Sequence, residues 1–236
     1  MHFHLPKPLH GWREFVGEVG IIVLGVLIAL GAEQIIDDIR WHQKVERTKT
    51  ELNAELHDDE LSAYRWLTDH RCMENALSAA DQAVGRARDT GEVPPIAAYD
   101  PPLQLFTSDA WLNARSLEVA DRMGPSAMRT YSRLYFFPSE LQDNIVQLHQ
   151  LASELKPLTY GLHHVSPDEA GEYQRSIARI RELQHRTEYA ELLLLQRGRN
   201  AGIRLSREEM EDSVRRFRSV YGPCTSPPDI DSPAPG

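Results

Sequence analysis

The most apolar stretch of the chain lies near its start, where residues 19–32 read VGIIVLGVLIALGA without one polar side chain. At about 1.5 Å of rise per residue this run spans about 21 Å, short of the roughly 30 Å hydrocarbon core of a bilayer. The longer segment 15–36 spans about 33 Å, with Glu18 and Glu33 near its two ends. We therefore expect a tail at residues 1–14 and a transmembrane helix at residues 15–36.

Two other interpretations of this segment stay open. Lys7 and Arg13 could form the basic region of a signal peptide, and residues 29–31 (ALG) fit a cleavage site. Cleavage there would release a soluble helical protein. The third interpretation is a buried helix of a soluble protein. Glu14 and Glu18 lie within the supposed basic region, and the helical pattern continues to residue 39, so an uncleaved anchor is favoured.

From residue 37 onwards the pattern is helical almost throughout. Residues 37 to about 88 contain no proline, and apolar residues recur there at helical spacing. These residues are Val45, Leu52, Leu56, Ala63, Leu67, Met73, Leu77, Ala80 and Val84. The segment 90–102 has four prolines, so it must be a connection between helices.

The second half of the chain predicts several further helices. One runs from about Ser108, a potential N-cap, to residue 123. The stretch 125–162 is bent or divided at Pro138, and its second half carries an apolar seam. The seam consists of Leu141, Ile145, Leu148, Ala152 and Leu155. No segment has the two-residue period of a strand.

Two capping boxes mark the last helices. Residues 166–169 (SPDE) open a helix to about residue 200, and residues 206–209 (SREE) open another that ends near residue 222. The segment 223–236 has five prolines in fourteen residues, which predicts disorder. The predicted fold is therefore all-α: an N-terminal transmembrane helix followed by an antiparallel helical bundle over residues 37–222.

Charge and motifs exclude several functions. A net charge of −9 argues against nucleic-acid binding, which needs a basic surface. No phosphate loop, serine elbow or paired-carboxylate motif is present, so we expect no enzyme activity, no cofactor and no metal. Glu182 and His185 have the Glu-x-x-His spacing of di-iron bundles, but those sites need a second copy. The polar cluster at residues 57–60 (HDDE) is interpreted as an exposed helical turn.

The cysteines and the small residues of the anchor suggest two contacts. Cys72 and Cys224 could form a disulfide in an oxidising compartment, or be two unrelated thiols. Gly25, Ala29 and Ala32 lie near one side of the anchor helix, together with Glu18. Small residues let helices approach closely in lipid, so this side suggests a homodimer formed through the membrane helix.

The N-terminus also carries a resemblance. Residues 3–34 (FHLPKPLHGWREFVGEVGIIVLGVLIALGAEQ) resemble the leader of a group of uncharacterised bacterial membrane proteins. The resemblance covers roughly the first forty residues and implies a single-pass protein of the bacterial inner membrane. It implies no activity.

These observations together predict a membrane-anchored interaction or scaffold module that contacts the lipid bilayer and an unidentified protein partner. The alternatives are a ligand-sensing extracytoplasmic bundle and a secreted helical protein released by signal cleavage. Lys/Arg counts on the two flanks slightly favour a cytoplasmic domain, but the positive-inside rule is weak for long domains. We expect the domain in the periplasm.

Overall fold

The structure is a computed structural model that describes residues 11–160 and 163–221, and it confirms the all-α fold. By its internal contacts the chain divides into two compact units, Met1–Arg47 and Thr48–Gly236. Helix α1 (Trp12–Thr90) contributes to both units. The predicted disordered segment 223–236 and residues 1–10 lie outside the described residues.

The first unit contains the apolar part of α1. In the described residues α1 is the one helix that is long and apolar enough to cross a membrane, and no residue of its most apolar window is buried. Ile21, Leu24 and Ile28, for example, expose 58–74% of their surface. A buried core helix would bury these side chains, so the exposed surface favours the other two interpretations. A membrane span and a signal peptide both remain compatible with the exposed surface.

The side of α1 with small residues is open in the single chain. Gly25, Ala29, Ala32 and Glu18 are all exposed, and a Cβ atom added at Gly25 would meet no atom within 4 Å. Dimerisation through this side stays a prediction.

Replacing Gly25 with Ile tests that dimer. In a dimer the added side chain would hold the two backbones apart, while insertion would hardly change because Ile is at least as apolar as Gly. We expect self-association in a bilayer, measured by energy transfer between labelled chains, to weaken markedly. Leu24→Ile, one residue away, is the control. Equal self-association of the Gly25→Ile variant and the wild type would leave a monomeric anchor.

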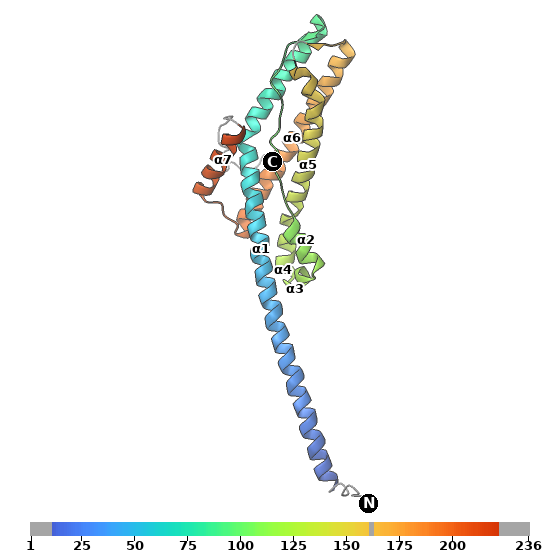
Figure 1. Cartoon of the computed structure of the whole chain (residues 1–236), viewed down its shortest axis with the longest axis vertical. Coiled ribbons are helices and arrows are strands. Elements are labelled where there is room, and N and C mark those ends of the chain that lie inside the picture. Colours follow the sequence, from blue (N-terminus) through green and yellow to red (C-terminus); the bar gives the residue numbers. More distant parts are fainter. Residues whose placement is uncertain (1–10, 161–162, 222–236) are drawn as a thin grey trace, which may run out of the picture. The chain divides into compact units, whose positions relative to one another are not determined.

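The second unit is built around three long helices. The C-terminal part of α1, α5 (Phe136–Leu155) and α6 (Pro167–Ala201) lie side by side (Figure 1). Both predicted apolar seams are confirmed, because every residue of them is buried. Trp66, with no exposed surface, is the largest of the fully buried side chains between the helices. Burial of these apolar surfaces provides most of the driving force for assembly of the bundle.

Side chains of the long helices hold the proline-rich connection in place. The connection begins at β1 (Glu92–Val93), which pairs with β2 (His163–His164) in a short antiparallel ladder that the sequence did not predict. The backbone N–H of Phe106 donates to Gln142, and that of Thr107 donates to Asp59. These contacts supply acceptors for backbone donors that no regular ladder could satisfy.

Short helices follow the connection. They are α2 (Asp109–Ser116), α3 (Val119–Arg122) and α4 (Pro125–Leu134). The single helix predicted to residue 123 is wrong, because Glu118 has a φ of 55° and separates α2 from α3. Ser108 does not cap α2 with its side chain; the carboxylate of Glu55 accepts from the N–H of Ala110 instead.

The predicted break at Pro138 lies elsewhere. The stretch divides at Tyr135, between α4 and α5, and Pro138 is the third residue of α5, where a missing N–H costs no helical hydrogen bond. A 3₁₀ turn, η1 (Lys156–Thr159), follows α5. Both capping boxes are confirmed: the Ser166 pair opens α6, and the Ser206 pair opens α7 (Arg207–Tyr221).

Candidate metal centre

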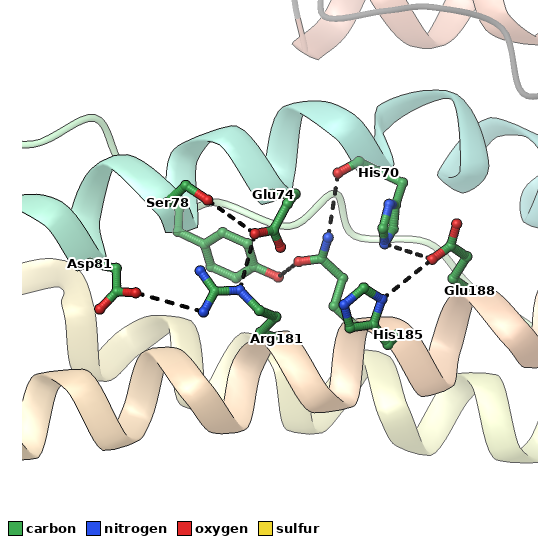
Figure 2. Close-up of polar contacts among 9 residues, drawn as sticks. His70, Glu74, Ser78, Asp81, Arg181, His185 and Glu188 are labelled. Carbon is green, nitrogen blue, oxygen red and sulfur yellow. Dashed lines mark hydrogen bonds and ion pairs between the residues drawn. The ribbon is translucent and has the colours of Figure 1, made fainter.

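The antiparallel pairing of α1 with α6 brings two polar stripes together. Figure 2 shows the facing residues, which follow one another at helical spacings. From α1 come His70, Glu74, Ser78 and Asp81, and from α6 come Arg181, His185 and Glu188. Similar spacings on two helices place each stripe on one face, so the register between the helices decides which side chains meet.

Three of these side chains converge on one point. Nε2 of His70 lies 3.0 Å from Oε2 of Glu188, and Nδ1 of His185 lies 3.6 Å from the same oxygen. The three potential ligand atoms all lie within 4.8 Å of one another. The two imidazole rings are 5.8 Å apart between centroids and inclined at 44°. Each ring therefore presents one nitrogen to a shared carboxylate (Figure 2).

Burial falls from one side of the cluster to the other. The His70 side chain is 16% exposed, Glu188 is 32% exposed, and His185 is 62% exposed. The cluster is thus anchored at α1 and open to solvent at His185. A small ion can reach such a site without unfolding of the bundle.

Electrostatics keep the shared carboxylate charged. The hydrogen bond with His70 lowers the pKa of Glu188 more than burial raises it, and His185 adds to the lowering. A carboxylate that is ionised at neutral pH is the form that binds a cation.

A chain of hydrogen bonds fixes the backbone behind His70. Oη of Tyr99 donates to Oε1 of Gln184, and Nε2 of Gln184 donates to the backbone carbonyl of His70 at 3.4 Å. Gln184 is 1% exposed and lies next to His185 in α6. These partners come from the connection, α6 and α1, so they hold the register in which the two histidines meet.

An ion-pair network holds the neighbouring turns. Nε of Arg181 lies 3.0 Å from Oε1 of Glu74, and Nη1 of Arg181 lies 3.7 Å from Asp81. Ser78 donates to the same oxygen of Glu74 at 3.0 Å. Because all four groups are partly buried, the network positions α6 along α1 more firmly than an exposed pair would.

Glu191 adds an unusual group one turn beyond Glu188. Its side chain has no exposed surface, and neither carboxylate oxygen has a hydrogen-bond partner among the described residues. Burial raises the pKa of Glu191 well above its usual value, and the charge of Glu188 raises it further. Burial thus favours the neutral form of Glu191 over the charged form, and a neutral Glu191 would not repel the carboxylate of Glu188.

The donor set of the cluster suits zinc. Imidazole nitrogen and carboxylate oxygen bind Zn²⁺ at about 2.0–2.2 Å, which places the ligand atoms of a tetrahedral site roughly 3.4 Å apart. The separations of 3.0 and 3.6 Å around Glu188 are close to that value. Three protein ligands leave one position for water or for an added ligand.

Several residue groups considered in the sequence analysis have a different outcome in the structure. Glu182 is exposed, and His185 pairs with Glu188 on its other side in the chain, so the Glu-x-x-His motif does not form a site. The exposed turn predicted at residues 57–60 is wrong: Asp59 and Glu60 are each 2% exposed. Cys72 lies half-buried in α1, and Cys224 lies outside the described residues, so their disulfide stays a prediction.

Sequence reasoning missed His70 and Glu188. The available signal was a second short spacing, His185-x-x-Glu188, which puts two ligands on one helical face just as Glu-x-x-His does. No sequence spacing marks His70 as a potential ligand, because its partners lie in a different helix. Known proteins add no further constraint, since no family model, curated protein or solved structure matches the chain.

Proposed function

We propose that the chain is a membrane-anchored helical module that binds a divalent transition-metal ion of the zinc class between α1 and α6. The observation that carries the proposal is the convergence of His70, His185 and Glu188, with three ligand atoms within 4.8 Å. The ion would lie between the imidazole nitrogens and the carboxylate oxygen, which are already in close contact. It would thereby join two helices that are distant in sequence.

This function belongs to the ligand-binding class of bundles rather than to the scaffold class that the sequence favoured. The preference rests on a localised group of ligands with supporting hydrogen bonds from Gln184 and Tyr99. Contacts with a protein partner remain compatible with it, because a metal that fixes the α1–α6 register would also fix the outer faces of both helices.

The second part of the proposal concerns the membrane anchor and the side on which the domain lies. Residues 15–36 would span the bacterial inner membrane, with the helical domain on the periplasmic side. The exposed apolar surface of α1 supports a span, and the leader resemblance supports the inner membrane. The domain would then meet metal ions before they enter the cytoplasm.

Zinc binding by the full-length protein in detergent tests the site. After removal of metal with a chelator, we expect one zinc ion per chain on equilibrium dialysis. His70→Ala and His185→Ala should each weaken the affinity by more than the roughly 10–100-fold that loss of an outer partner costs. His164→Ala is the matched control, because His164 also lies near a carboxylate, 3.6 Å from Glu92, but among the described residues it belongs to no group of three potential metal ligands.

Wild-type affinity in the His70→Ala and His185→Ala variants would contradict the proposal, as would complete loss in the control. Loss of zinc binding on replacement of Cys72 alone, with binding unchanged in the two histidine variants, would instead assign the zinc to cysteine.

A further inference from the structure

A second hollow of the domain has a different chemistry. A pocket of about 630 Å³ lies between α4 and the C-terminal end of α6. Most of its lining side chains are cationic or neutral hydrogen-bond donors. They are Ser126, Arg129, Thr130 and Arg133 from α4, and Arg197 and Asn200 from α6.

The spacing of these residues explains why they meet. The four α4 residues follow at i, i+3, i+4 and i+7, which is one face of a helix. Arg197 and Asn200 are three apart and so share a face of α6. The opposite side of α4 packs inward through Tyr131, whose hydroxyl donates to Asn53. Packing of α4 on the bundle therefore fixes the polar face toward α6.

The pocket concentrates positive charge on an acidic protein. The chain carries a net charge of −9, yet α4 and residues 192–201 contain no acidic residue. Within the described part of the chain, none of Arg129, Arg133 and Arg197 forms an ion pair with a carboxylate. Three like charges around one hollow repel one another, and an anion between them would relieve that repulsion.

Arg197 is also held in place. Its guanidinium carbon lies 4.9 Å from the centroid of the Phe137 ring. Stacking on a ring occupies a face of the guanidinium and leaves its N–H edges available, and those edges match the oxygens of a phosphate.

We propose that this pocket binds the phosphate group of a small organic anion or of a lipid headgroup. Guanidinium groups bind phosphate through paired, charge-assisted hydrogen bonds, and the hydroxyl and amide groups supply further donors. The volume lies within the 300–1,000 Å³ range of small-molecule sites, so the phosphate would carry an organic portion. The site is independent of the proposed metal centre.

The test uses the full-length protein in detergent and follows its unfolding temperature with three added compounds. They are glycerol 3-phosphate, dioctanoyl-phosphatidylglycerol and, as the uncharged lipid, dioctanoylglycerol. We expect a phosphate compound to raise the unfolding temperature above the effect of dioctanoylglycerol. In Arg133→Gln and Arg197→Gln the dissociation constant should rise at least about tenfold, the usual cost of losing one hydrogen bond between charged groups.

Arg175→Gln is the control, since Arg175 is exposed on the same helix α6 but lies outside the pocket and changes the net charge equally. Stabilisation by glycerol 3-phosphate alone would identify a soluble ligand, and stabilisation by phosphatidylglycerol alone would identify a lipid; either supports the site. The proposal is overturned if neither phosphate compound stabilises the wild type. It is also overturned if Arg133→Gln and Arg197→Gln bind as well as Arg175→Gln.

Discussion

Asp59→Asn is expected to stabilise the domain at pH 8 and to change it little at pH 4. The pKa of Asp59 is raised from 3.8 to about 8, mainly by burial. The hydrogen bond from the N–H of Thr107 lowers this pKa, and the charge of Glu55 raises it further. Between these values the folded protein keeps a proton that the unfolded chain has lost. The stability that Asp59 contributes is therefore fully present below pH 3.8 and is lost as the pH rises toward 8, by about 1.4 kcal/mol per pH unit.

Asparagine removes that loss. Its carbonyl oxygen can still accept from Thr107, and it has no charge to bury. Over these roughly four pH units the loss amounts to about 6 kcal/mol. We therefore expect the unfolding temperature of the variant at pH 8 to exceed that of the wild type by more than about 10 °C, since 1 kcal/mol corresponds to about 2–4 °C for a chain of this size. Asp58→Asn is the matched control, because the adjacent Asp58 side chain is 84% exposed.

Glu60 should behave in the same way. Its pKa is raised from 4.5 to about 8, mainly by burial and despite the attraction of Arg199. The wild-type protein should thus be less stable at pH 8 than at pH 5.

If Asp59→Asn were no more stable than Asp58→Asn at pH 8, the buried position of Asp59 would be wrong.

Two arginines in the apolar segment should release the protein from membranes. Leu24 and Leu27 lie in the middle of residues 15–36 and are both exposed. Replacing both with Arg costs roughly 5–7 kcal/mol of insertion free energy. We expect wild-type protein of full length to resist carbonate extraction and the Leu24→Arg/Leu27→Arg variant to be lost from the membrane fraction. Leu24→Ile/Leu27→Ile should behave as wild type.

The same preparation tests the side of the membrane. Protease added to intact spheroplasts should digest the domain, since we propose that it lies in the periplasm. Protection until lysis would place the domain in the cytoplasm and make a Cys72–Cys224 disulfide improbable. A soluble wild-type chain that starts at Ala32 would replace the anchor with a cleaved signal peptide.

The parts of the fold that depend on local pattern were predictable. The apolar seam of α5, from Leu141 to Leu155, has a period that only a helix can bury on one side. The capping box at Ser166 needs only residues three apart, so its hydrogen bonds follow from the sequence.

The parts that depend on distant neighbours were not predictable. Asp59 and Glu60 look like an exposed polar turn until the connection reaches Asp59 through Thr107 and α6 places Gly198 against Glu60. A Cβ atom at Gly198 would overlap the carboxylate of Glu60, so a glycine far along the chain makes room for that side chain. The pattern of apolar and polar residues within α1 does not indicate that these two side chains are buried.

The candidate metal centre could not be predicted from the sequence for the same reason. His185 and Glu188 share a face of α6 by spacing alone, but His70 joins them only through the register between α1 and α6. The arginine pocket likewise needs α4 to pack against α6. Sequence patterns within one helix identify faces, and the fold decides which faces meet.

The most direct measurement of the central claim is X-ray absorption at the zinc edge on the full-length, zinc-loaded protein. The proposed site predicts a spectrum with two imidazole groups and carboxylate oxygen at about 2.0–2.2 Å from the metal. The imidazole signals should disappear in the double variant His70→Ala/His185→Ala and persist in His164→Ala. A spectrum of oxygen or sulfur ligands without imidazole, or one unchanged in the double variant, would contradict a metal centre at His70, His185 and Glu188.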